Sequence, residues 1–319
     1  MTLLIYTLLE WIDINNLDWC FLSKNVNAIK LLKENPDKVF WNNLSLNPNA
    51  IELLKENSDK IDWDNLSINS NAIELLKENQ DKINWRLLSL KCSTESIKLL
   101  QKNPDKIYWN YLSENPNAVE ILKDNLDKVY WSRLSFNPNA IELLKENIDK
   151  VDWDILSRNP NAIELLKKNP DKINWYYLSF NPNAIELLKE NIDKVDWDIL
   201  SSNPNAIKIL KENIDKIDWF RLSSNPNAIK ILKDNQDKIN WRLLSLDSSL
   251  EAMELLKDNQ DKIYWRYLSM NPSIFKLDYK QMSKNFKSFY LELMEKALHP
   301  DRISRYLEQY NFDIRDWFY

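Results

Sequence analysis

Apolar and polar positions recur along most of the chain in units of 22 residues. In residues 47–57, four apolar side chains lie within five positions, a wide stripe that predicts a helix of about three turns packed against two neighbours. In residues 58–67, Trp63 and Leu66 are three apart, which predicts a single α-turn or a 3-10 helix. No stretch alternates with period two over a useful length, so no strand is expected. Each unit is therefore predicted to be a long helix, a tight corner, a short helix and a second corner.

Polar residues mark the ends of the predicted long helices. Asn47 before Pro48 predicts an N-cap, and Asn49 with Glu52 offers a capping box two residues later. An asparagine follows the apolar stripe in each full unit, and in a chain without glycine it is the residue best suited to a left-handed C′ position. The predicted helix ends are Asn35, Asn57, Asn79, Asn103, Asn125, Asn147, Asn169, Asn191, Asn213, Asn235 and Asn259.

A tryptophan marks every unit and is followed three residues later by leucine and then serine. The twelve are Trp19, Trp41, Trp63, Trp85, Trp109, Trp131, Trp153, Trp175, Trp197, Trp219, Trp241 and Trp265. The residue before each, such as Asp62, Asn84 or Asp152, stands where the N-cap of the short helix is expected. Two steps, ending at Trp109 and Trp265, are 24 residues long and contain a helix start capped by serine. One hypothesis is that these longer units adjust curvature once per superhelical turn.

A single unit of this kind cannot bury both of its apolar faces, so the copies must stack. The prediction is an all-α protein: an α-solenoid superhelix of twelve units of about 22 residues, each a long helix plus a short α or 3-10 helix. At about 8–10 Å between packed helices, twelve layers make a rod or superhelix on the order of 100 Å long. Residues 19–273 are the expected solenoid, with residues 1–18 as an N-terminal cap and 274–319 as a C-terminal helical cap.

Two families share features with this repeat. The Leu-Ser-Leu-Asn-Pro-Asn run of residues 44–49, followed by Glu-Leu-Leu, resembles the leucine-rich variant repeat, which implies alternating α- and 3-10 helices over about residues 19–273. That family has about two more residues per unit and a basic residue where this chain has Trp63, and its iron–sulfur cysteines have no counterpart here. The amino-acid sequence of the repeat also resembles that of proteins that giant, Mimivirus-like DNA viruses of amoebae encode in many copies. That resemblance implies a source and no mechanism.

Composition argues against an enzyme. Without glycine, the chain has no phosphate-binding loop, dinucleotide fingerprint or nucleophile elbow. His299 is the single histidine, and Cys20 and Cys92 are far apart without metal-type spacing, so no catalytic triad, metal site or cofactor is expected. The apolar residues 1–9 lack the flanks of a signal peptide, and no stretch is apolar enough to span a membrane. These features predict a soluble protein of the cytoplasm. If the protein is viral, the cytoplasm is that of the host cell, and packaging in the virion is an alternative.

Function is expected where the units differ, because a tryptophan present in every layer fits a structural ladder better than a ligand site. Tyrosine and arginine are frequent at the variable positions beside it, and both are enriched at binding hot spots. The candidate partner-binding residues are Arg86, Tyr108, Tyr111, Tyr130, Arg133, Tyr176, Tyr177, Phe220, Arg221, Arg242, Tyr264, Arg266 and Tyr267. We expect the pairs Tyr108 with Tyr111 and Tyr264 with Tyr267, three residues apart, each to share one face.

The leading hypothesis from sequence is a non-enzymatic scaffold or adaptor that binds a protein partner, with self-association or a place in a viral assembly as variants of it. The alternative is single-stranded nucleic-acid binding by stacked Tyr and Arg side chains. A net charge of −5 and aspartates at residues 64, 154 and 198 oppose that alternative. An enzyme is a distant third hypothesis.

Overall fold

The computed structural model describes residues 4–90, 93–297, 299, 302–303 and 305. The chain divides into two compact units, Glu10–Ile274 and, separately, Met1–Leu9 with Phe275–Tyr319. The division after Ile274 comes one residue after the expected end of the repeats. The N-terminal division comes nine residues before the expected one, because residues 14–16 already form the corner of the first repeat.

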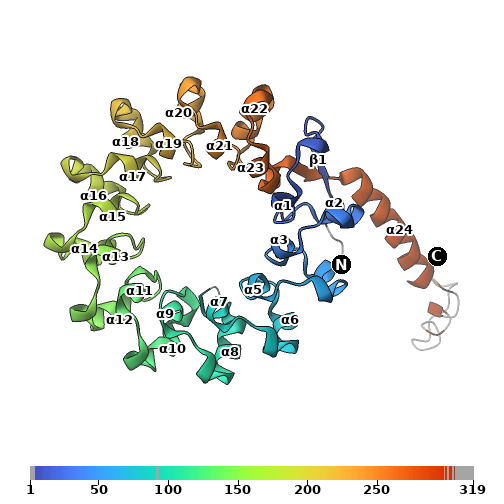
Figure 1. Ribbon diagram of the computed structural model, residues 1–319, viewed down its shortest axis with the longest axis horizontal. Helices are drawn as coiled ribbons and strands as arrows, with labels where there is room; N and C mark the ends of the chain where they lie inside the picture. Colours follow the sequence, from blue (N-terminus) through green and yellow to red (C-terminus); the bar gives the residue numbers. More distant parts are fainter. Residues whose placement is uncertain (1–3, 91–92, 298, 300–301, 304, 306–319) are drawn as a thin grey trace, which may run out of the picture. The chain divides into compact units, whose positions relative to one another are not determined.

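In residues 10–274, each repeat contributes an inner helix that starts at its tryptophan and an outer helix after the next corner (Figure 1). The inner helices are α1 (Trp19–Leu22), α3 (Trp41–Ser45), α5 (Trp63–Leu66), α7 (Trp85–Leu90), α9 (Trp109–Leu112), α11 (Trp131–Phe136), α13 (Trp153–Ser157), α15 (Trp175–Ser179), α17 (Trp197–Ser201), α19 (Trp219–Leu222), α21 (Trp241–Leu244) and α23 (Trp265–Met270). The outer helices are α2 (Ile29–Glu34), α4 (Ile51–Lys55), α6 (Ile73–Glu78), α8 (Thr94–Lys102), α10 (Val119–Lys123), α12 (Ile141–Glu146), α14 (Ile163–Lys167), α16 (Ile185–Glu190), α18 (Ile207–Glu212), α20 (Ile229–Lys233) and α22 (Leu250–Asp258). Each pair is called a layer, numbered from the N-terminus, and layer 12 has α23 alone.

A 3-10 helix leads into each inner helix, and in all of them except the first it contains the Asp-Lys pair of the corner. These are η1 (Ile14–Asn16), η2 (Pro36–Lys38), η3 (Ser58–Lys60), η4 (Gln80–Lys82), η5 (Pro104–Lys106), η7 (Leu126–Lys128), η8 (Ile148–Lys150), η9 (Pro170–Lys172), η10 (Ile192–Lys194), η11 (Ile214–Lys216), η12 (Gln236–Lys238) and η13 (Gln260–Lys262); η6 (Pro116–Ala118) and η14 (Pro272–Ile274) lie at other corners. The predicted N-caps before tryptophan are confirmed: the side chains of Asp62, Asn84 and Asp152 accept hydrogen bonds from backbone N–H groups three residues later.

The outer helices are shorter than predicted. Helix α4 begins at Ile51, and its N-cap Ala50 makes no side-chain hydrogen bond. Asn47 instead closes a turn, because its Oδ1 accepts from the N–H of Asn49 at 3.0 Å. This local bond competes with the first helical turn, so Asn-Pro-Asn-Ala forms a corner. Only α8 and α22, in the two longer units, reach nine residues, and their serine caps are present as predicted.

The asparagines at the helix ends are not left-handed, and that prediction is wrong. Their φ angles lie between −138° and −128°. Each side-chain Nδ2 donates to the carbonyl four residues earlier, as from Asn57 to Leu53 at 2.9 Å. The amide therefore satisfies an orphan carbonyl of the helix end directly, and the backbone has no need of a positive φ.

The core lies between the inner and outer helices of each layer. Leu44, Ala50 and Leu54 have no exposed surface, and their equivalents repeat this burial around the unit. Burying one leucine side chain is worth about 1.5–3 kcal/mol, so this set, together with the buried Leu53 and Ile61, supplies the apolar stabilisation of a layer.

The serine of each Leu-Ser pair joins its layer to the next. Its hydroxyl donates to the tryptophan carbonyl four residues earlier and accepts the N–H of the residue before the next tryptophan. In all twelve layers this second bond is 2.8–3.2 Å long. The donor and the acceptor of this buried hydroxyl are thus both satisfied, whereas an apolar side chain at this position would leave the bonded N–H of the next layer without its partner.

A buried asparagine at the corner after most inner helices forms a second ladder. The Nδ2 of Asn181 donates to the carbonyls of Ser157 at 3.2 Å and Asn159 at 2.8 Å, both in the preceding layer. Its Oδ1 accepts from the N–H of Asn183 at 3.0 Å. The other members are Asn25, Asn47, Asn69, Asn115, Asn137, Asn159, Asn203, Asn225 and Asn271.

Both ladders close on themselves, so residues 10–274 form a ring (Figure 1). The N–H of Asp18 donates to Ser269 Oγ at 2.8 Å, and Asn25 Nδ2 donates to the carbonyls of Ser269 and Asn271 at 3.0 and 2.8 Å. The all-α solenoid of helix pairs is confirmed, but the rod or open superhelix is not. Twelve layers turn the chain through a full circle without rising along its axis. Because a closed ring has no successive superhelical turns, the hypothesis that the two longer units adjust curvature once per superhelical turn does not apply.

The other unit contains a small sheet and a long helix. Strands β1 (Tyr6–Leu8) and β2 (Phe275–Leu277) pair antiparallel, with Thr7 opposite Lys276. The prediction that the chain has no strand is wrong here, because three residues are too few to show a period-two pattern. Helix α24 (Tyr279–Ala297) follows. Among the described residues, no helix is both long and apolar enough to cross a membrane.

Candidate interaction surface on the inner helices

The inner helices surround the central opening of the ring (Figure 1). The leucine and serine three and four places after each tryptophan are buried in the layer. The residues one, two and five places after it share the remaining face and vary from layer to layer. We call this set of side chains the inner surface.

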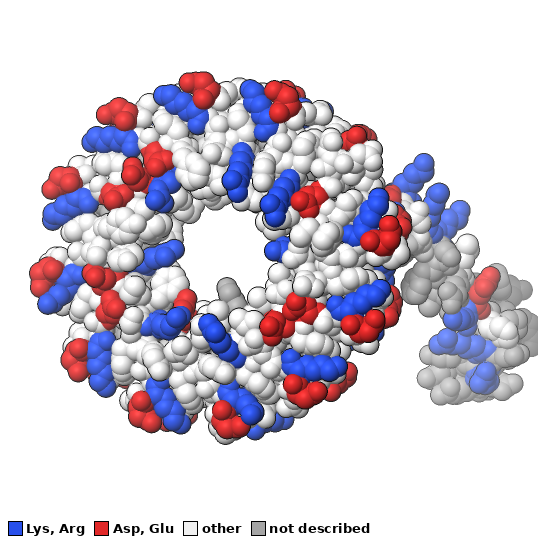
Figure 2. Space-filling model, viewed as in Figure 1, with Lys and Arg blue, Asp and Glu red and all other residues white. Residues whose placement is uncertain are grey.

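Arginine is confined to the inner surface within the ring. All six arginines of residues 10–274 lie there, namely Arg86, Arg133, Arg158, Arg221, Arg242 and Arg266. Figure 2 shows basic side chains projecting into the opening, whereas Lys and Asp or Glu alternate along the outer rim. There, pairs such as Lys55 with Glu52 and Lys189 with Glu186, three residues apart on one helix, form ion pairs at 3.2 and 2.7 Å. The cations of the inner surface are therefore arginines, apart from Lys24, and arginine is suited to stacking and bidentate bonding.

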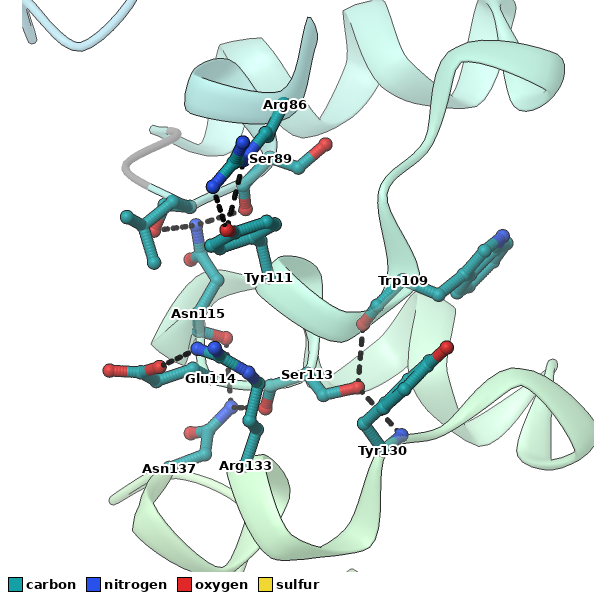
Figure 3. Close-up of polar contacts among 11 residues, drawn as sticks. Arg86, Ser89, Trp109, Tyr111, Ser113, Glu114, Asn115, Tyr130, Arg133 and Asn137 are labelled. Atoms are coloured by element: carbon teal, nitrogen blue, oxygen red, sulfur yellow. Dashed lines mark hydrogen bonds and ion pairs between the residues drawn. The ribbon is translucent and has the colours of Figure 1, made fainter.

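Arginines and aromatic rings alternate between layers. Tyr111 of α9 lies between Arg86 and Arg133 of the adjacent layers, with each guanidinium carbon 4.9 Å from the ring centroid (Figure 3). Arg86 Nε also donates to the Tyr111 hydroxyl at 2.9 Å, and Arg133 forms an ion pair with Glu114 at 2.8 Å. The ring and the two guanidinium groups form one stack that runs through layers 4, 5 and 6.

A second stack reverses the order. The guanidinium of Arg158 lies 5.5 Å from the ring centroid of Phe136 and 4.7 Å from that of Phe180. Tyr176 packs edge-to-face against Phe180 and against Tyr177, with centroid distances of 6.0 and 5.3 Å. These contacts join layers 6, 7 and 8.

A third stack crosses the place where the chain's first and last layers meet. Arg242 Nη2 donates to the Tyr267 hydroxyl at 2.9 Å, a bond that raises the pKa of this guanidinium above its ordinary value. The ring centroids of Tyr267 and Phe21 of layer 1 are 6.2 Å apart, and the guanidinium carbon of Arg266 lies 4.5 Å from the Phe21 ring centroid. Arg266 also faces Asp18, with Nε and Oδ2 3.8 Å apart.

The tryptophans are half-buried, and a lysine of the next layer covers one face of most of them. In nine layers this lysine Nζ lies 4.6–4.8 Å from the indole centroid, as with Lys238 over Trp219. A covered face is not free to stack on a ligand, which agrees with a structural role. The Asp-Lys pair, present at each corner except the first, is the signal in the sequence for this contact.

The structure brings some predicted site residues together and separates others. Tyr264 and Tyr267 pack edge-to-face at 4.9 Å, as expected from their spacing. Tyr130 lies beside Trp109 and away from Tyr111 (Figure 3). It precedes its inner helix, as Tyr108 does, and both are about half exposed. These N-cap positions lie outside the inner surface.

Two further predicted residues are neighbours in layer 10. Phe220 is 61% exposed, the highest value among the aromatic residues predicted for the site. Arg221 Nε lies 3.8 Å from Asp218 Oδ2. Sequence reasoning missed Phe21, Glu114, Phe136, Arg158 and Phe180. Four of these follow the Leu-Ser pair directly, and the variation at that position from layer to layer is the signal in the sequence that could have found them.

Pockets and metal sites add little to this surface. An open groove of about 690 Å³ lies beside layers 3–5, and its lining mixes Asp64 and Asp105 with Lys82, Arg86 and Lys106. Within the part of the chain that the structure describes, no three His, Cys, Asp or Glu side chains are grouped to hold a metal ion. Cys20 is a free, half-buried thiol that accepts a hydrogen bond from Asn43, and Cys92 lies outside the described residues.

No family model, curated protein or solved structure matches this chain. The two resemblances drawn from the repeat therefore stay predictions, and the site has to be interpreted from its own geometry.

Proposed function

We propose that this protein is a non-enzymatic interaction scaffold that binds a protein partner through the inner surface of its ring. The observation that carries the proposal is the division between constant and variable positions. Serine, asparagine and tryptophan repeat in nearly every layer and hold the layers together, whereas Arg, Tyr and Phe vary layer by layer around the opening. Such side chains are enriched among the residues that dominate binding energy at protein interfaces.

The size of the opening favours an elongated part of a partner. Inner helices about 9 Å apart form a circle about 35 Å across between opposite axes, and the width of a helix leaves an opening about 20–25 Å wide. A single helix about 10–12 Å wide fits this space with room for side-chain contacts. A folded domain of ordinary size does not fit, so the proposed occupant is a helical or extended segment.

Single-stranded nucleic acid is the second candidate, because arginines stacked on aromatic rings line the opening. Against it, Asp64, Asp154 and Asp198 occupy the position directly after tryptophan, where they would face the phosphates. Binding of an oligonucleotide that weakens steeply with salt would favour this second candidate over the first.

An affinity pull-down from the native cell tests the proposal. Two variants remove aromatics in different places: the double variant Tyr264→Ala with Tyr267→Ala, which removes one inner-surface ring and the N-cap ring packed against it, and Tyr176→Ala in layer 8. The control is Ile192→Ala, which removes an exposed apolar side chain at the η10 corner. We expect both inner-surface variants to lose a protein that the wild type and the control retain. Unchanged partners in both variants would refute binding through this surface.

A further inference from the structure

The seam, where layer 12 meets layer 1, differs from the other junctions between layers. No peptide links its two sides locally, since Asn25 bonds to a residue 246 positions away. Within residues 10–274, layer 12 also has no outer helix to pack beside α2. Asn16 stands where the other corners have the lysine that covers the preceding tryptophan. The seam therefore keeps the serine and asparagine ladder bonds of the other junctions, but it lacks the packing of an outer helix beside α2 and the corner lysine.

The inner surface is electrically uneven, and the seam lies in its basic part. Layers 10, 11, 12 and 1 carry Arg221, Arg242, Arg266 and Lys24 on the inner surface, and no Asp or Glu. The remaining eight layers carry three arginines and four carboxylates, at Asp64, Glu114, Asp154 and Asp198. These four consecutive layers, a third of the ring, thus form a continuous cationic arc, with three of the layers on one side of the seam and layer 1 on the other.

The cations of this arc are only partly neutralised. Arg221 and Arg266 each face one N-cap aspartate at 3.8 Å, near the outer limit of an ion pair. Among the described residues, neither Arg242 nor Lys24 has a carboxylate within ion-pair distance; they contact Tyr267 and Phe21 instead. A guanidinium that stacks on an aromatic ring keeps N–H donors at its edge, in a geometry that matches a carboxylate.

We propose that this arc binds an acidic segment of the partner protein and that binding holds the ring closed. The proposal rests on the scaffold function and names the chemistry of its partner. Carboxylates suit the arc better than a polyphosphate strand, because a strand that follows the inner surface meets the four carboxylates of the other layers. Residues from both sides of the seam build the arc, so it is complete only in the closed ring. A ligand of the arc therefore stabilises closure by linkage.

Binding is measured by fluorescence anisotropy with the full chain and a fluorescein-labelled peptide of eight glutamates. The seam variants are Arg242→Gln and Arg266→Gln, and the control Lys211→Gln removes one positive charge from an exposed site on the outer helix α18. Loss of one charge-assisted contact at a solvent-exposed site predicts about five-fold weaker binding for each seam variant. The control should bind within about two-fold of wild type, the difference that long-range screening allows.

Closure is measured by hydrogen–deuterium exchange at the Asp18 N–H, which donates to Ser269 across the seam. The matched control is the Asp196 N–H, which donates to Ser179 in the same way between layers joined by the chain. The peptide should slow exchange at Asp18 at least about five-fold and leave Asp196 unchanged, as expected for a ligand at several times its Kd.

Four outcomes would overturn this inference: no binding of the peptide, equal weakening in the control variant, equal protection of both amides, or seam-dependent binding of an oligothymidylate in place of the peptide. A pull-down partner that is lost with Tyr176→Ala but retained by both seam variants would leave the scaffold function standing and refute the acidic arc. If the proposed scaffold function itself were wrong, every inner-surface variant would retain the same partners as the wild type.

Discussion

Replacing Asn181 by alanine removes three hydrogen bonds, two of them buried, at one step of the asparagine ladder. The side chain has no exposed surface, and its amide bonds to the carbonyls of Ser157 and Asn159 and to the N–H of Asn183. Alanine leaves the Ser157 carbonyl and the Asn183 N–H without these partners, while the Asn159 carbonyl keeps the bond from the Ala162 N–H. Each unpartnered group costs about 1–3 kcal/mol, so we expect the free energy of unfolding to fall by about 2–6 kcal/mol.

Asn183→Ala is the matched control, because it removes an asparagine two residues away in the same corner. Asn183 makes one exposed interlayer bond, from Nδ2 to the Pro160 carbonyl at 2.9 Å. Its loss should cost about 0.5–1 kcal/mol, since water replaces the missing partner. Urea denaturation followed by tryptophan fluorescence measures both values. Equal costs for the two variants would refute the view that the buried amide holds adjacent layers together.

Three further predictions concern other contacts of the ring. Ser269→Ala should raise the rate of amide hydrogen exchange at the seam by an order of magnitude or more, because it removes about 1–2 kcal/mol of local hydrogen bonding. An unchanged exchange rate would refute the closed ring. Lys238→Met should lower stability by about 0.5–1 kcal/mol and increase acrylamide quenching of Trp219, while unchanged quenching would show that this face is uncovered. The hydrogen bond and charge of Lys189 lower the pKa of Glu186, so this pair stabilises the fold above the usual glutamate range and loses its effect as pH falls through the lowered pKa. In a carboxyl NMR titration, Lys189→Met should raise the Glu186 pKa towards the ordinary glutamate range, and an unchanged pKa would refute the assignment.

The layers could be predicted from the sequence because their contacts repeat with a fixed spacing. Apolar periodicity located the helices, and the residue before each tryptophan located the N-caps, as at Asp62. Backbone conformation at Asn57 could not be predicted in this way, because an asparagine serves either a left-handed C′ position or a side-chain cap. The two choices look the same in the sequence.

Ring closure also could not be predicted from the sequence. It depends on the angle between layers, a small quantity set by how Leu, Ala and Ser side chains fit together and summed over twelve steps. Candidate site residues were identified by type and variability, which found Arg86, Tyr111 and Arg133. Their stacking order, and the part that Phe136 and Arg158 play, depends on which layers face one another.

Closure also fixes how many repeats this chain can hold. Twelve layers in a full circle require about 30° of turn per layer, and a thirteenth would require about 28° at every junction at once. Open solenoids gain or lose whole repeats at an end with little effect on the rest, but a ring has no end at which to do so. Lengthening within a unit is absorbed: Ser89 and Ser245 still reach Tyr108 and Tyr264 at 3.2 and 3.1 Å across the two 24-residue units. Sequence change in this protein should therefore be tolerated within the corners, while the number of repeats stays constant.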